Sequence, residues 1–180
     1  MRIFNVSKLK WDKKYIIAHI IVIFAAIICG IVLYILNNIN NYIYDFADVY
    51  VFYIFNFENG TLFFAHFLSE LFFLYAVFAI CFFTKLKFLA CPLIFLKTLF
   101  TALYTIILCA LFSTEGIIVV ILVFIPSFVL SIIALIFLSE QCKIIRRPLC
   151  FFLPAIIALV SSLVFLLLIN VVFRFIVVIV

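Results

Sequence analysis

Charge and glycine are both scarce in this chain of 180 residues, and each shortage excludes a class of function. Asp, Glu, Lys and Arg make up only 11% of the residues, whereas a soluble domain has about 25%. Three glycines are too few for a glycine-rich phosphate loop or for the glycine-flanked serine of a hydrolase. The glycine-interrupted half-helices of many transporters are missing for the same reason. We therefore expect no enzyme and no cofactor, and the composition also disfavours an autonomous transporter.

Apolar residues make up 72% of the chain and gather in long runs. A membrane helix needs about 20 apolar residues to cross about 30 Å of hydrocarbon. We therefore predict an all-α, polytopic membrane protein, a single membrane domain over residues 1–180. Its five transmembrane helices are expected at about 15–36, 61–84, 88–112, 116–138 and 149–173. The first run is far longer than the roughly 7–15 apolar residues of a signal peptide, so we expect it to be retained.

The connections between these runs predict the topology. Basic residues gather in the tail 1–14, at Lys85 and Lys87, and between Lys143 and Arg147, whereas the alternate connections hold only acids. Positively charged connections stay in the cytoplasm, so the N-terminus is predicted to be cytoplasmic and the C-terminus extracytoplasmic. Short basic clusters beside membrane helices are typical of contacts with anionic lipid. We expect a multi-pass protein of a bacterial plasma membrane, with membrane lipid and not nucleic acid as its partner.

The cysteines form no recognisable metal motif. All six lie in predicted spans or near the predicted cytoplasmic face: Cys29, Cys81, Cys91, Cys109, Cys142 and Cys150. Thiols stay reduced on the cytoplasmic side, and the spacing of the last two is not that of a zinc site. We expect free thiols and no metal.

An aromatic-rich segment, residues 37–60, is predicted to lie outside the membrane. It is too polar to span and too apolar for a free loop, so a short helix in the outer interface is expected. Exposed aromatic side chains are typical of partner surfaces, and the residues we assign to such a surface are Phe46, Tyr50, Tyr53 and Phe57. The alternative is that the segment only caps the bundle.

Glu70 and Lys97 fall near the middle of the second and third predicted spans. A charge at that depth costs at least about 2.5–3.5 kcal/mol on insertion scales. The tight connection near Leu86 places Glu70 about one helical turn from Lys97, a gap that two long side chains can close. We predict an intramembrane ion pair that links the two spans. A proton or ion relay that includes His66, four residues before Glu70, is the alternative.

Small side chains mark the helix faces expected to pack together in lipid. Their positions are Ala26 and Gly30; Thr101, Thr105 and Cys109; Ser127, Ser131 and Ala134; and Ala155, Ala158 and Ser162. Asn170 and Ser161 are expected to make hydrogen bonds between helices. Pro92, Pro126 and Pro154 are expected at kinks or helix starts.

The layout resembles the stage II sporulation protein M family, which comprises small bacterial membrane proteins with five spans. The similar part is residues 61–180. It includes the turn at Ala90, Cys91 and Pro92, Lys97 followed by small residues, and a basic connection before the last span. Gly116 and the stretch Ile125, Pro126 and Ser127 also fit.

The resemblance implies a non-catalytic scaffold that anchors extracytoplasmic proteins for cell-wall remodelling, with peptidoglycan hydrolases as partners, in the engulfment step of sporulation. The alternative function is a small transporter or permease subunit that uses Glu70, His66 and Lys97.

Overall fold

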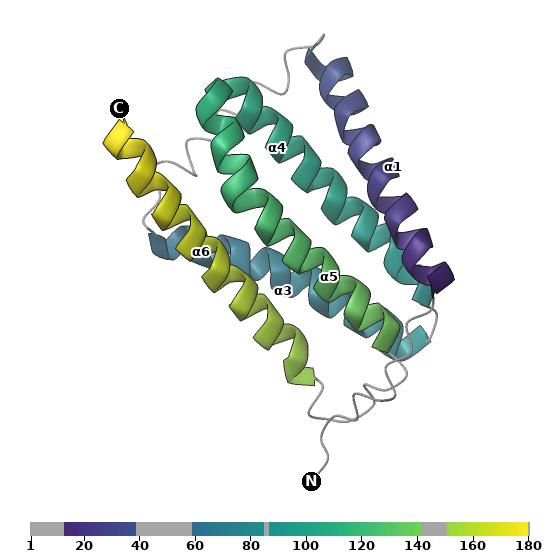
Figure 1. Cartoon of the computed structure of the whole chain (residues 1–180). Coiled ribbons are helices and arrows are strands. Elements are labelled where there is room, and N and C mark those ends of the chain that lie inside the picture. Colours follow the sequence, from purple (N-terminus) through teal and green to yellow (C-terminus); the bar gives the residue numbers. More distant parts are fainter. Residues whose placement is uncertain (1–12, 39–58, 85–86, 142–150, 180) are drawn as a thin grey trace.

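The structure, a computed structural model, describes residues 13–38, 59–84, 87–141 and 151–179, and all of them are helical (Figure 1). The long helices are α1 (Lys13–Asn38), α3 (Asn59–Thr84), α4 (Cys91–Val119), α5 (Ile125–Gln141) and α6 (Leu153–Ile179). A short 3₁₀ helix, η2 (Lys87–Ala90), precedes α4, and a π-helical turn, η3 (Val120–Phe124), precedes α5.

Among the described residues, five helices are long and apolar enough to cross a membrane, which agrees with the predicted number. The starts of α1 (Lys13), α3 (Asn59) and α6 (Leu153) differ from the predicted ones by two to four residues. In contrast, α4 extends to Val119, beyond the predicted end at 112, and α5 begins only at Ile125 and not at 116. Large apolar side chains are exposed around the bundle, as expected of helices that face lipid. The segment that carries Phe46, Tyr50, Tyr53 and Phe57 lies outside the described residues, as do 1–12 and 142–150.

The chain reverses sharply inside α4, between Leu108 and Gly116, so that the end of α4 continues through η3 into α5 in the opposite direction (Figure 1). A Cβ added to Gly116 would lie 2.2 Å from the carbonyl oxygen of Leu108, eight residues earlier. In a straight helix those positions would be about 12 Å apart. Glycine is required here because the opposing atoms belong to the backbone and cannot move aside.

The π-helical turn η3 lies immediately before Pro126. The Ile125 N–H reaches back to the Val120 carbonyl, five residues earlier. Proline has no N–H and its ring clashes with the carbonyl four residues before it in a regular α-helix. The wider turn accommodates that ring, so that α5 starts with Pro126 as its second residue. Pro92 and Pro154 likewise lie in the first turns of α4 and α6.

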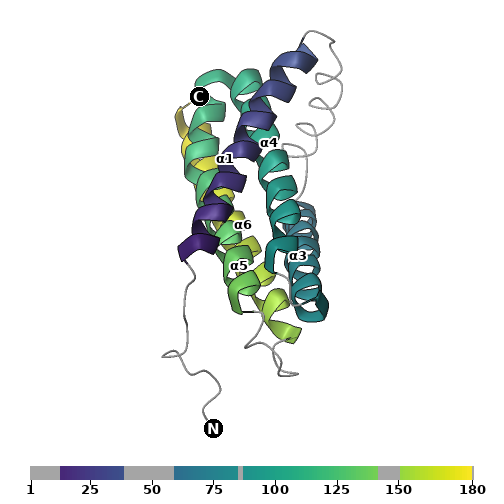
Figure 2. The same cartoon turned by 90° about the vertical axis from the view of Figure 1, so that its right-hand side faces the viewer.

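The helices pack in two groups that share α4. α1 packs mainly against α4, whereas α3 packs more extensively against α6 and α5 than against α4. Although only a short connection joins α3 and α4, the two helices do not pack along their lengths. Figures 1 and 2 show that α3 is inclined across the back of α5 and α6. Its contact with α4 therefore depends on long side chains.

In the part of the chain that the structure describes, two apolar clusters fill the interior, one towards each end of the bundle. The larger surrounds Leu74, Ile94 and Leu135 at the end where η2 lies. The smaller contains Val123, Phe165 and Ile169, towards the chain reversal at Gly116. Between the two clusters, α3, α4, α5 and α6 contribute polar side chains that are buried or partly buried: His66, Glu70, Lys97, Ser127, Ser131 and Ser162. These side chains form a polar layer, which contains the candidate site.

Candidate functional site

The centre of the polar layer is a contact between Glu70 on α3 and Lys97 on α4. Lys97 Nζ donates to Glu70 Oε1 at 2.6 Å. The two residues are only 4% and 6% exposed, so water contributes little to their solvation. The pair carries no net charge, because the ammonium charge of one offsets the carboxylate charge of the other. Two groups that would be costly to bury separately are thus placed together near the middle of two candidate spans.

A serine on α5 forms a hydrogen bond with the second oxygen of the carboxylate. Ser131 Oγ donates to Glu70 Oε2 at 2.6 Å, so each carboxylate oxygen accepts a short hydrogen bond from a different helix. On the other side, the Lys97 ammonium lies 5.1 Å from the centre of the Phe73 ring, within range of a cation–π interaction. Glu70 therefore connects α3 to both α4 and α5.

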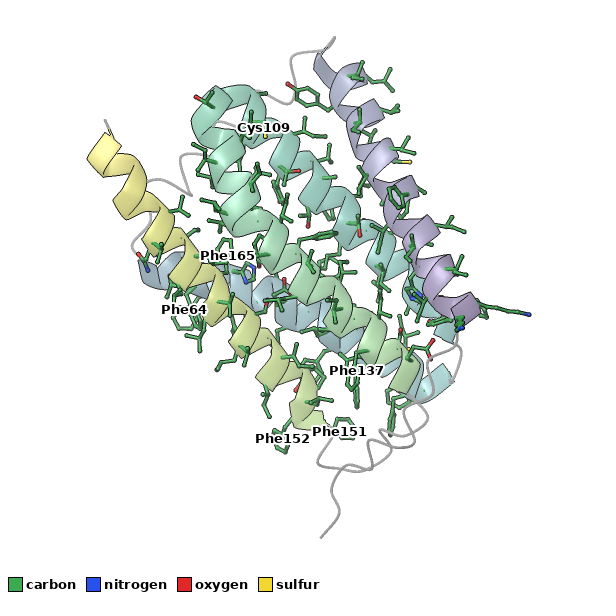
Figure 3. All side chains as sticks on the ribbon, viewed as in Figure 1. Phe64, Cys109, Phe137, Phe151, Phe152 and Phe165 are labelled. Carbon is green, nitrogen blue, oxygen red and sulfur yellow. The ribbon has the colours of Figure 1, made fainter. Side chains whose placement is uncertain are left out.

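His66 lies one helical turn before Glu70 and connects α3 to the remaining helix, α6. Its Nδ1 is 3.0 Å from Ser162 Oγ, and its Nε2 is 3.2 Å from Ser127 Oγ. The ring stacks on Phe165, with centroids 4.1 Å apart and an interplanar angle of 14°; Phe165 lies on α6 where that helix faces α5 (Figure 3). A neutral imidazole has one donor and one acceptor nitrogen, and two serine hydroxyls satisfy both.

His66 and Glu70 are close but not tightly bonded. His66 Nε2 lies 3.8 Å from Glu70 Oε1, beyond the range of a good hydrogen bond. The structure thus brings all three proposed site residues, Glu70, Lys97 and His66, into one layer. Within it, two separate networks form, one around the carboxylate and one around the imidazole.

The serine partners are the functional residues that sequence reasoning missed. Ser127, Ser131 and Ser162 were identified only as small residues at helix seams, yet each bonds a polar side chain of α3. Ser161 was expected to make an interhelical bond instead. It is buried and its Oγ has no hydrogen-bond partner in the described part of the chain. Asn170 is half-buried on α6.

A cavity of about 300 Å³ adjoins both networks. Its inner wall contains Glu70, Lys97, His66 and Ser127, and aromatic side chains from all four helices line the rest: Phe73, Phe100, Tyr104, Phe124, Phe128 and Phe165. Ala65, Ser69 and Phe100 also line it and are exposed at the perimeter of the bundle. The cavity therefore extends from the buried polar groups to the side of the bundle.

A second group of buried polar residues lies at the end of the bundle where η2 lies. His19, Ser139 and Glu140 are each at most 5% exposed. His19 Nδ1 donates to the Tyr15 carbonyl at 2.8 Å, and the Tyr15 ring packs against the imidazole. Neither the spacing nor the residue type distinguishes His19 and Glu140 from ordinary residues at the end of a helix. Their burial shows that α1 and α5 exclude solvent at this end.

The described cysteines are free thiols. Cys29 is exposed, Cys81 is buried, and Cys91 and Cys109 are partly buried. Within residues 13–38, 59–84, 87–141 and 151–179, no group of three or more His, Cys, Asp or Glu side chains could hold a metal ion.

No family model, curated protein or solved structure matches the chain. The resemblance to the stage II sporulation protein M family therefore stays a prediction.

Proposed function

We propose that the protein is a non-catalytic scaffold of a bacterial plasma membrane. It anchors extracytoplasmic proteins that remodel the peptidoglycan wall, with the N-terminus in the cytoplasm and the C-terminus outside. The observation that supports this proposal best is the state of Glu70. Both carboxylate oxygens accept hydrogen bonds, from Lys97 and from Ser131. Buried charges that are paired by hydrogen bonds hold helices together. A membrane anchor requires a stable helix bundle of this kind.

The recruitment surface belongs to the aromatic segment that precedes α3. We assign it to Tyr50 and Tyr53, with Phe46 and Phe57 beside them. Aromatic anchors dominate the binding energy of many protein interfaces. The scaffold is expected to present these side chains to wall hydrolases in the envelope.

Cross-linking in intact cells, followed by capture of the full chain, tests recruitment. Replacing Tyr50 and Tyr53 with Ala is expected to remove peptidoglycan hydrolases from the captured material while the protein is still made. Tyr34→Ala, an aromatic change near the end of α1, serves as the control and should leave capture intact. Unchanged capture by the double variant would contradict the proposal.

Reporter fusions test the orientation. Fusions at Tyr50 and at Lys87 are expected to report opposite compartments, because one span separates these positions. The same compartment for both would overturn the scaffold as described.

A second candidate function is a small transporter or permease subunit that uses Glu70, His66 and Lys97. The specific observation in its favour is the cavity, which all three residues line. Glu70→Gln distinguishes the two functions. A scaffold variant is expected to give less folded protein but to retain its partners once folded. A relay variant is expected to fold normally and to lose ion flux.

A further inference from the structure

The buried polar groups beside the cavity include a hydrogen-bond donor with unused capacity. An ammonium group has three donors, and Lys97 makes one hydrogen bond to a described residue, to Glu70. Both Glu70 oxygens accept a bond, and both His66 nitrogens face a serine hydroxyl. Lys97 therefore keeps donors without a partner among the described residues, and it is itself only 6% exposed and lines the cavity.

The charge balance of the site restricts what these donors can bind. Glu70 already offsets the charge of Lys97, and the pair is neutral whether the shared proton resides on nitrogen or on oxygen. An anion would add an uncompensated charge at low dielectric, which is costly. The ligand that fits is neutral and carries acceptor oxygens.

The shape of the cavity indicates the route of entry. Ser69 and Phe100 lie at its rim and are exposed at the side of the bundle, in the middle part of the candidate spans Phe63–Phe83 and Phe88–Ala110. Hydrocarbon is expected at that depth, so a molecule that enters there arrives from the bilayer. The volume of about 300 Å³ lies at the lower end of the range for ligand pockets, about 300–1,000 Å³. It suits a ring-sized head group whose tail remains in lipid.

We propose that this cavity binds the neutral, carbonyl-bearing head group of a membrane-borne molecule. The carbonyl oxygen accepts a hydrogen bond from Lys97 Nζ, and the aromatic side chains Phe100, Phe124 and Phe128 surround the head group. A quinone ring and the acyl ester of a lipid share this chemistry. The inference does not depend on the scaffold function, because it concerns the interior of the bundle and not the aromatic segment outside it.

Binding is measured on the full chain in lipid nanodiscs, with empty nanodiscs as the background. The probes are radiolabelled decylubiquinone, dioctanoylglycerol and decylbenzene, the last of which has no acceptor oxygen. We expect saturable binding of one molecule per chain for at least one carbonyl probe, and at least tenfold weaker binding of decylbenzene. The carbonyl probe that binds identifies the source of the head group.

Two variants at the side of the bundle locate the site without touching the Glu70–Lys97 pair. Ala65→Trp places a large side chain at the rim of the cavity and should weaken binding at least tenfold. Leu68→Trp is the control, because Leu68 is also exposed on α3 but does not line the cavity; binding should change less than twofold. No saturable binding of either carbonyl probe, equal binding of decylbenzene, or equal effects of the two variants would each overturn the proposal.

Discussion

The contact of α1 with α4 and the contact of α3 with α4 use opposite means to join helices. At the first contact, Ala26 is fully buried and a Cβ on Gly30 would lie 3.0 Å from the Ala102 Cβ. At the second, the helices are joined by Glu70 and Lys97, two of the longer side chains in the sequence. One contact depends on small residues and close backbones, the other on a charge-assisted hydrogen bond across a wider gap.

The two kinds of contact differ in how much space they leave between the helices. Helices in lipid lack a hydrophobic driving force between them, so they associate by close packing or by polar bonds. Close packing leaves no space, and no residue of α1 lines the cavity beside Glu70 and Lys97. Long polar side chains hold α3 near α4 while leaving a cavity between them. The polar layer therefore both links the helices and keeps part of the interior open.

The largest effect is expected from Lys97→Met, which breaks the polar link from one side. The carboxylate of Glu70 would remain buried without its counter-charge, and removing one partner of a buried pair costs about 3–5 kcal/mol. The yield of folded protein and the midpoint of unfolding in detergent should both fall sharply. Leu96→Met, one residue earlier and exposed, should change neither. A Lys97→Met protein as stable as the parent would contradict a structural role for the pair.

A smaller effect is expected from Gly30→Leu, which breaks the close-packed contact. The new side chain would collide with Ala102 and push α1 away from α4, at a cost of about 1–3 kcal/mol. Unfolding in detergent measures the loss. Ala25→Leu, at an exposed position on α1, provides the matched control. If both variants are equally stable, the close contact does not hold α1 in place.

The smallest effect is expected from Ser131→Ala, which removes one bond of the polar layer and leaves the charge pair intact. Interhelical hydrogen bonds in membranes average about 0.6 kcal/mol, with a maximum of about 1.7. Ser69→Ala is the control, because Ser69 is exposed and makes no hydrogen bond to a described residue. If Ser131→Ala lowers the free energy of unfolding as much as Lys97→Met does, the serine and not the lysine stabilises the polar layer.

The number of helices and the approach of Glu70 to Lys97 could be predicted because both depend on local constraints. Apolar runs of sufficient length determine the helices. A connection of a few residues then determines the antiparallel register of α3 and α4, and hence which charges meet. The small residues at Ala26, Gly30 and Ala158 also lie at buried positions, as the requirement for close packing predicts.

The rest depends on the packing of helices that no short connection constrains. Neither composition nor spacing indicates that α3 packs mainly on α6, so the partners of His66 on α5 and α6 could not be assigned. Pro126 predicts a break in the regular helical hydrogen bonding. It does not indicate that the break is a π-helical turn. One signal for the serines was present: Ser127 and Ser131 are four residues apart, matching the spacing of His66 and Glu70 on α3.

A double-mutant cycle between Glu70 and Lys97, measured by unfolding the protein in mixed detergent micelles, tests the central claim most directly. Glu70→Met and Lys97→Met each leave one charge buried alone, whereas the double variant leaves none. We predict a coupling of at least about 2 kcal/mol, with the double variant more stable than either single variant. Additive losses in the cycle would contradict the claim that this pair holds the bundle together.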